Sequence, residues 1–154
     1  MIPPQTDGSP PDWRQHLLTT PDQIQRLLER SHRVAVLGIK PDPVKPANYV
    51  PAYVQKAGYE IIPVPVYYPD VKEILGLPVY RSLLDVPGEI DIVNVFRRPA
   101  DVAKHVAEIL VKQPKAVWMQ LGIRNDDVAQ TLAVGGIDVV QDHCMLIELR
   151  RLGR

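Results

Sequence analysis

The sequence predicts an α/β domain, in which a doubly wound parallel sheet of five strands carries helices on both faces. Five short runs of apolar residues have the length and continuous hydrophobicity of strands that are buried on both sides. Helical patterns separate most of these runs, and that alternation is typical of βαβ units. The chain has 154 residues, which suits one domain with one sizeable core.

An extra helix is predicted before the sheet. Residues 1–11 are rich in proline, and we expect a flexible tail there and a single domain over 12–154. A helix should follow Thr20, because Thr20 can cap it, Pro21 suits its first position and Gln23 completes a capping box. The apolar face of this helix consists of Ile24, Leu27 and Leu28.

The first half of the sheet contains two predicted strands, residues 33–39 and 59–64. A helix over 48–57 lies between them, and Gly58 ends it. A short turn of helix is expected at residues 74–75, before Gly76. In the connector over 80–87, Ser82 can cap one further helical turn.

The second half contributes three predicted strands, residues 90–96, 116–120 and 137–140. Pro99 opens the helix after the first of these, and Asn125 caps the helix after the second. A closing helix spans about 144–152. The buried stripe expected on the Pro99 helix consists of Val102, Val106, Ile109 and Leu110.

Right-handed crossovers with one reversal of winding favour the strand order 3-2-1-4-5. Ligands bind such sheets beyond the carboxyl ends of the strands, where the winding reverses, which this order places between strands 1 and 4. The loops that matter are therefore 38–49, 65–70, 96–99 and 120–125.

The loop after strand 1 suits an anion. Gly38 permits a tight turn where a phosphate can approach the backbone, and Lys40 and Lys45 add positive charge. The second and third glycines of the dinucleotide fingerprint are missing. The alternative is an ordinary strand-to-helix loop with two solvated lysines.

The loop after strand 2 offers Tyr67 and Tyr68, an aromatic wall that can receive an adenine or can simply pack on the surface. No acidic residue directly follows this strand to bind a ribose hydroxyl, and Asp70, a little beyond, is the only candidate. The lack of such an acid counts against a plain dehydrogenase. After strand 3, Arg97 and Arg98 suit phosphate, whose oxygens match guanidinium groups. The alternative is that these arginines form ion pairs with Glu89, Asp91 or Asp101.

Composition narrows the class of partner. Lys plus Arg and Asp plus Glu each number 18, and this balance argues against nucleic-acid or membrane-surface partners. We expect a cytoplasmic protein, since the sequence has no signal-peptide pattern and no run of the ~18 apolar residues that a membrane span needs. Its one cysteine, Cys144, excludes an internal disulfide and a cysteine-rich metal site.

No catalytic motif is found. His105 precedes the apolar Val106 and is interpreted as a solvated helix residue. His143 and Cys144 are adjacent, but neighbours in sequence rarely point at each other and no orienting acid is evident. We therefore predict neither catalytic residues nor metal ligands.

From residue 33 to 152 the chain resembles the stand-alone CoA-binding domain proteins, which are similar to the N-terminal CoA-binding domain of the succinyl-CoA synthetase alpha subunit. The matching segments are residues 34–38 with Asp42 and Pro43, 58–64, 91–99 (DIVNVFRRP), 117–123 (VWMQLGI) and the cysteine-containing 142–148 (DHCMLIE). The resemblance implies a Rossmann-like domain that binds coenzyme A or an acyl-CoA without catalysis.

The resemblance also implies a set of cofactor-binding residues. The phosphate loop would be Gly38, Ile39 and Lys40, with Lys45 and Asn48 nearby, and Val64 and Pro65 would flank the adenine. The pantetheine path would be lined by Phe96, Arg97, Arg98, Gln120 and Gly122. Two departures matter: Ile39 is bulkier than the family's usual residue and can narrow the phosphate approach, and Pro65 removes an amide.

Two other functions stay open at this point. One is a NAD(P)-dependent oxidoreductase or redox sensor, which the missing glycines and missing ribose acid disfavour. The other is an interaction module whose pocket is vestigial, which Ile39 and Pro65 favour. The expected partner is a small molecule, and the sequence identifies no protein partner.

Overall fold

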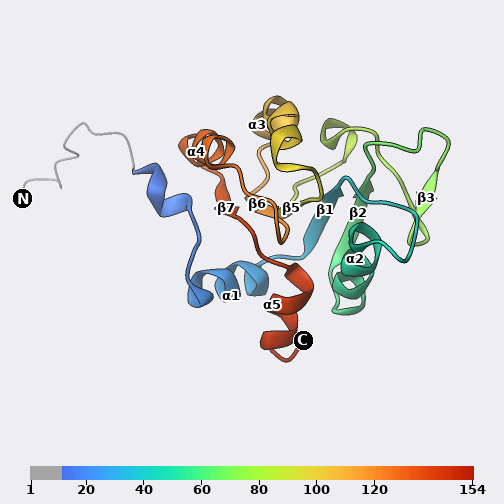
Figure 1. Ribbon diagram of the computed structural model, residues 1–154, viewed down its shortest axis with the longest axis horizontal. Coiled ribbons are helices and arrows are strands. Elements are labelled where there is room, and N and C mark those ends of the chain that lie inside the picture. Colours follow the sequence, from blue (N-terminus) through green and yellow to red (C-terminus); the bar gives the residue numbers. More distant parts are fainter. Residues whose placement is uncertain (1–11) are drawn as a thin grey trace, which may run out of the picture.

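The computed structural model describes residues 12–154 and contains the expected parallel sheet with helices on both faces (Figure 1). The predicted tail, 1–11, lies outside the described residues. The strands of the sheet, in spatial order, are β2 (Glu60–Val64), β1 (Arg33–Leu37), β5 (Ile92–Val95), β6 (Ala116–Met119) and β7 (Asp138–Val140). Each neighbouring pair is parallel, so the α/β fold class is confirmed.

The predicted strand order 3-2-1-4-5 is wrong. The third strand in sequence, β5, pairs with β1, which gives the order 2-1-3-4-5 and moves the reversal of winding to the gap between β1 and β5. Pro63 in β2 explains the difference, because proline has no N–H to donate and is confined to edge strands. The carbonyl of Pro63 accepts instead from the amide of Tyr80, in the segment that covers this edge, at 2.9 Å.

A small hairpin replaces the turn of helix expected at residues 74–75. Strands β3 (Glu73–Ile74) and β4 (Leu77–Pro78) pair antiparallel across a two-residue loop. Leu75 and Gly76 both have positive φ, 56° and 74°, as the favoured two-residue hairpin turn requires. The apolar Ile74 is buried in the core as a strand residue.

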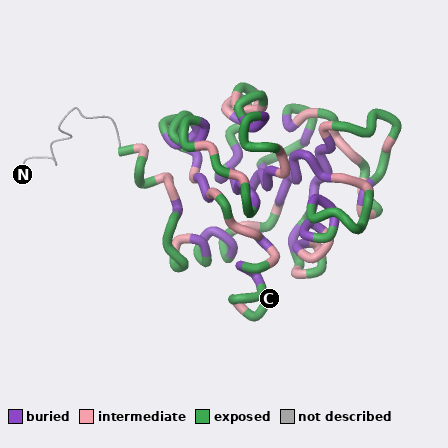
Figure 2. Tube along the Cα trace, in the orientation of Figure 1, coloured by how far each residue is buried: buried purple, intermediate pink, exposed green. Residues whose placement is uncertain are grey.

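The helices form one layer on each face of the sheet (Figure 1). The first layer packs on one hydrophobic cluster and consists of α1 (Pro21–Arg30), α2 (Pro46–Lys56) and α5 (Met145–Arg151). The second packs on the other cluster and consists of α3 (Val106–Lys112) and α4 (Asp126–Val134), with the 3-10 helices η2 (Leu83–Asp85) and η3 (Pro99–His105). A further 3-10 helix, η1 (Trp13–His16), precedes α1. Buried segments follow the sheet and the inner sides of both layers (Figure 2).

Local capping signals are confirmed. Thr20 and Gln23 form the reciprocal capping box of α1, and the side chains of Ser82 and Asn125 cap η2 and α4. The helix predicted from Pro99 is confirmed only in part, because its first seven residues wind as a 3-10 helix before α3 continues it. Among residues 12–154, no helix has the length and apolar character that crossing a membrane requires.

The ends of β1 and β5 approach each other very closely at Gly38. Its φ is +90°, and a Cβ built there would lie 2.2 Å from the carbonyl oxygen of Phe96. That distance is far shorter than any contact between a carbon and an oxygen that are not bonded. The absence of a side chain at residue 38 therefore allows the loops after the two strands to leave the sheet side by side.

Gly38→Ala should destabilise the protein more than Gly136→Ala does. Both glycines have positive φ, but a Cβ at Gly136 meets nothing within 4 Å. In the control variant, Gly136→Ala, left-handed backbone strain should lower the free energy of unfolding by roughly 1–2 kcal/mol. In Gly38→Ala, the clash with Phe96 should lower it by about 1–3 kcal/mol more. Urea unfolding measures both values, and equal losses would contradict the role of close packing at Gly38.

Candidate functional site

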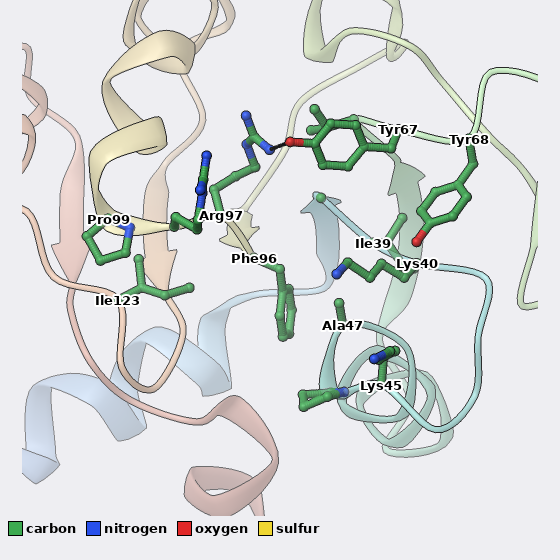
Figure 3. A pocket seen from close by; sticks show the side chains of 14 residues that line it. Ile39, Lys40, Lys45, Ala47, Tyr67, Tyr68, Phe96, Arg97, Pro99 and Ile123 are labelled. Carbon is green, nitrogen blue, oxygen red and sulfur yellow. Dashed lines mark hydrogen bonds between the residues drawn. The ribbon is translucent and has the colours of Figure 1, made fainter.

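A cavity of about 420 Å³ opens at the carboxyl ends of β1 and β5, where the winding reverses (Figure 3). Of the residues predicted from the sequence, it is lined by Gly38, Ile39, Lys40, Lys45, Phe96, Arg97 and Arg98. The two tyrosines of the predicted aromatic wall, Tyr67 and Tyr68, also line it. The remaining lining residues lie in the loops that the sequence analysis selected but were not among its predicted binding residues: Pro46, Ala47, Val66, Pro99 and Ile123.

The loop between β1 and α2 forms one side of the cavity. The side chain of Ile39 is fully buried in the hydrophobic core, and Ile39 also belongs to the lining of the cavity. Asn48 is also buried, and its side-chain amide donates to the carbonyl of Lys40 at 2.7 Å. Asn48 therefore shapes the loop from behind and does not line the cavity.

Two lysines of this loop, Lys40 and Lys45, present positive charge to the cavity. The ammonium groups of Lys40 and Lys45 lie at the cavity on the side of α2 (Figure 3). Within residues 12–154, neither lysine forms an ion pair with a carboxylate. An anion that enters the cavity can therefore meet both charges without displacing a carboxylate of these described residues.

The segment after β2 forms the opposite wall. Val64 and Pro65 are buried beneath it, whereas Val66, Tyr67 and Tyr68 line the cavity. Arg81 holds this segment in place by donating to the carbonyls of Tyr67, Tyr68 and Val71 at 3.1, 2.8 and 2.6 Å. The tyrosines thus belong to a fixed loop, although their side chains are exposed.

Arg97 reaches across to this wall. Its guanidinium donates to the phenolic oxygen of Tyr67 at 3.2 Å and lies 5.4 Å from the centre of the Tyr67 ring (Figure 3). The hydrogen bond and the positive charge of Arg97 lower the pKa of Tyr67. On its other side, Nε of Arg97 donates to Nε2 of His105 at 3.1 Å.

Arg98, next in sequence, is held differently. Its Nε donates to Asp101 at 2.8 Å, and Lys104 binds the other oxygen of the same carboxylate at 2.9 Å. Hydrogen bonds from Lys104 and Arg98 lower the pKa of Asp101 to about 2. The ion pair with Asp101, the alternative considered for these arginines, therefore forms at Arg98 but not at Arg97. Lys115 pairs with Glu89 and Asp91, the other two candidate acids.

The expectation of a solvated His105 is wrong. Only 13% of its side chain is exposed, and it lies between Arg97 and Glu108. The 3-10 winding of η3 accounts for the error, because residues three apart share a face in a 3-10 helix. His105 therefore lies on the same face as Val102, which is fully buried.

The loop after β6 contributes a different residue from those predicted. Gln120 is buried and its side-chain oxygen accepts from Asn94, while the amide of Gly122 donates to Asp142 at 2.6 Å. Neither residue lines the cavity. A turn in which the Ile123 amide donates to the Gln120 carbonyl at 2.8 Å brings Ile123 to the lining instead.

The histidine and cysteine after β7 do not form a pair directed at the cavity. Nδ1 of His143 lies 2.6 Å from the carbonyl of Gln141, and Cys144 is half-buried at the start of α5. Neither residue lines the cavity. Among the described residues, no three His, Cys, Asp or Glu side chains gather as a metal site.

Comparison with known proteins identifies the family. Residues 32–150 match the model of the CoA binding domain. The chain belongs to this family. The segment matched begins just before β1 and ends in α5, so it contains the whole sheet and every residue that lines the cavity. The resemblance stated from the sequence is thereby confirmed.

Similar proteins match most of the chain. The Bacillus subtilis (strain 168) protein YneT, described as uncharacterized, is 38% identical over 125 residues, which are 81% of this chain and 90% of YneT. A solved structure from Thermus thermophilus is 37% identical with a TM-score of 0.80, and the match covers 87% of this chain and 99% of that one. A hypothetical protein from Pyrococcus horikoshii OT3 is 32% identical with a TM-score of 0.81, covering 88% and 94%.

The charge cluster at Asp101 predicts a dependence of stability on pH. Because folding lowers the pKa of Asp101 to about 2, from about 4 in the unfolded chain, its ionised form stabilises the protein above pH 4. This stabilisation should disappear as the pH falls toward 2. The difference in unfolding free energy between the parent and Asp101→Asn, measured by chemical denaturation, should be constant from pH 7 to 5 and shrink below pH 4. A difference that does not vary with pH would contradict the assignment.

Proposed function

We propose that this protein binds coenzyme A or an acyl-CoA in the cavity between the ends of β1 and β5, without transforming it. The observation that carries the proposal is the combination of cationic and apolar side chains within that one cavity. Lys40, Lys45 and Arg97 supply positive charge, and Phe96 and Ile123 supply apolar surface. CoA has matching parts, since its phosphates are anionic and its pantetheine arm is largely uncharged. Membership of the CoA binding domain family supports the same ligand.

The geometry suggests which part of the ligand each wall receives. The backbone turn at Gly38, together with Lys40 and Lys45, suits the pyrophosphate. Tyr67 and Tyr68 offer ring faces to the adenine, and Phe96, Pro99 and Ile123 offer apolar surface to the pantetheine arm. Asn48, Val64, Pro65, Gln120 and Gly122 would then act behind this lining by fixing the loops that carry it.

A nicotinamide dinucleotide fits this cavity less well. Asp70, the only acid predicted for a ribose hydroxyl, is exposed and does not line the cavity. Lysines without carboxylate partners favour a more strongly anionic ligand, and CoA carries a 3′-phosphate that NAD lacks. We therefore keep NAD as the comparison ligand in the test.

CoA should raise the thermal stability of the protein. A ligand that binds only the folded state stabilises it by about 2.7 kcal/mol when its concentration is a hundred times its Kd. Thermal unfolding with CoA, acetyl-CoA, dephospho-CoA and NAD compares the candidates directly. The proposal requires an increase in Tm with CoA or acetyl-CoA that exceeds the increase with NAD. A shift with NAD and none with either CoA compound would favour the oxidoreductase class instead.

Arg97→Ala should weaken CoA binding more than Arg98→Ala does. Among residues 12–154 the charge of Arg97 meets no carboxylate, whereas the charge of Arg98 is compensated by Asp101. Loss of a charge-assisted hydrogen bond to phosphate costs about 1.5–3 kcal/mol. Isothermal titration calorimetry measures both variants, and 0.5 M salt should reduce the effect if the contact is exposed. An equal or larger loss in Arg98→Ala would show that the charges have been assigned to the wrong arginine.

A further inference from the structure

Arg97 belongs to a chain of side chains that runs from the cavity into the layer of helices above it. Its Nε donates to Nε2 of His105 at 3.1 Å, and Nδ1 of His105 lies 2.8 Å from a carboxylate oxygen of Glu108. The other oxygen of Glu108 accepts from the hydroxyl of Ser82 at 2.9 Å and from the amide of Leu83 at 3.2 Å. The chain thus connects the end of β5 to η3, α3 and η2.

The donors and acceptors in this chain define the state of the histidine. The Nε of arginine is always a donor, so Nε2 of His105 must be an acceptor and carries no proton. Nδ1 then holds the one ring proton and donates it to Glu108. In this geometry the imidazole is neutral, and Glu108 fixes both its tautomer and its orientation.

The neutral imidazole separates the guanidinium from the carboxylate. Glu108 is the carboxylate at the far side of this histidine, and His105 lies between it and Arg97. With His105 between them, Arg97 is held by two uncharged acceptors, His105 and the phenol of Tyr67, and no carboxylate of the described residues pairs with it. Arg98 shows the opposite arrangement, since it donates directly to the carboxylate of Asp101.

We propose that His105 is a positioning residue, which orients Arg97 toward a phosphate of the bound CoA and keeps its charge available for that contact. This proposal rests on the proposed function of CoA binding. The order of the contacts argues against a nucleophilic role for the same trio, because Ser82 bonds to the carboxylate and not to the imidazole. In this protein Ser82 donates to Glu108, whereas the serine of a catalytic triad donates to the histidine.

The test is a double-mutant cycle on CoA affinity, measured by calorimetry on the full chain. His105→Leu removes the acceptor for Arg97 and should raise the Kd for CoA about tenfold, within the range of coupled neighbours. His105→Gln offers an amide oxygen near the position of Nε2, and its Kd should stay within about threefold of the parent. In the Arg97→Ala background, His105→Leu should change the Kd less than about twofold, since the residue that it positions is gone.

Controls separate this effect from a general loss of structure. His32→Leu, an exposed histidine before the amino end of β1, should bind CoA like the parent. Thermal unfolding without ligand shows whether each variant folds, and His105→Ala replaces His105→Leu in the cycle if the latter does not. Equal weakening by His105→Leu in the presence and absence of Arg97, or no restoration by His105→Gln, overturns the proposal. A parent protein that fails to bind CoA overturns the proposed function, and this inference with it.

Discussion

The close approach of two strand ends, with only a hydrogen atom between them, determines how the rest of the molecule is arranged around its cavity. A Cβ at Gly38 would lie 2.2 Å from the carbonyl oxygen of Phe96, so the ends of β1 and β5 can be adjacent only with glycine there. Their loops then diverge from nearly the same point, one toward α2 and the other toward η3. The space between these loops is the cavity.

The charges around that space differ in how freely they can act. Lys40 and Lys45 extend from the loop before α2 without carboxylate partners among the described residues. Arg98 is neutralised by Asp101, and Arg97 is held by uncharged groups. The cavity thus contains several cations, but an incoming anion meets their charges unequally, which a count of basic residues in the sequence does not reveal.

Local sequence signals predicted most helices and strands correctly. The order of the strands in the sheet depends on contacts between distant residues, which local signals do not describe. The caps at Thr20, Ser82 and Asn125 act within a few residues and were predicted correctly. The strand order depends on which strands can form backbone hydrogen bonds with a neighbour on each side. Pro63, which has no N–H, was the residue in the sequence that indicated an edge position for β2. His105 was misplaced because the change from 3.6 to 3 residues per turn in η3 rotates it toward Val102.

The wall opposite the lysines is held by the side chain of Arg81 and not by strand pairing. Three carbonyl groups of residues 67–71 accept from its guanidinium, so the path of this segment is fixed through backbone atoms that every amino acid possesses. No strand pairing passes through Tyr67 or Tyr68. Substitutions at Tyr67 and Tyr68 can therefore change the chemical groups that face the cavity, while the contacts of Arg81 with the backbone keep the loop on its course.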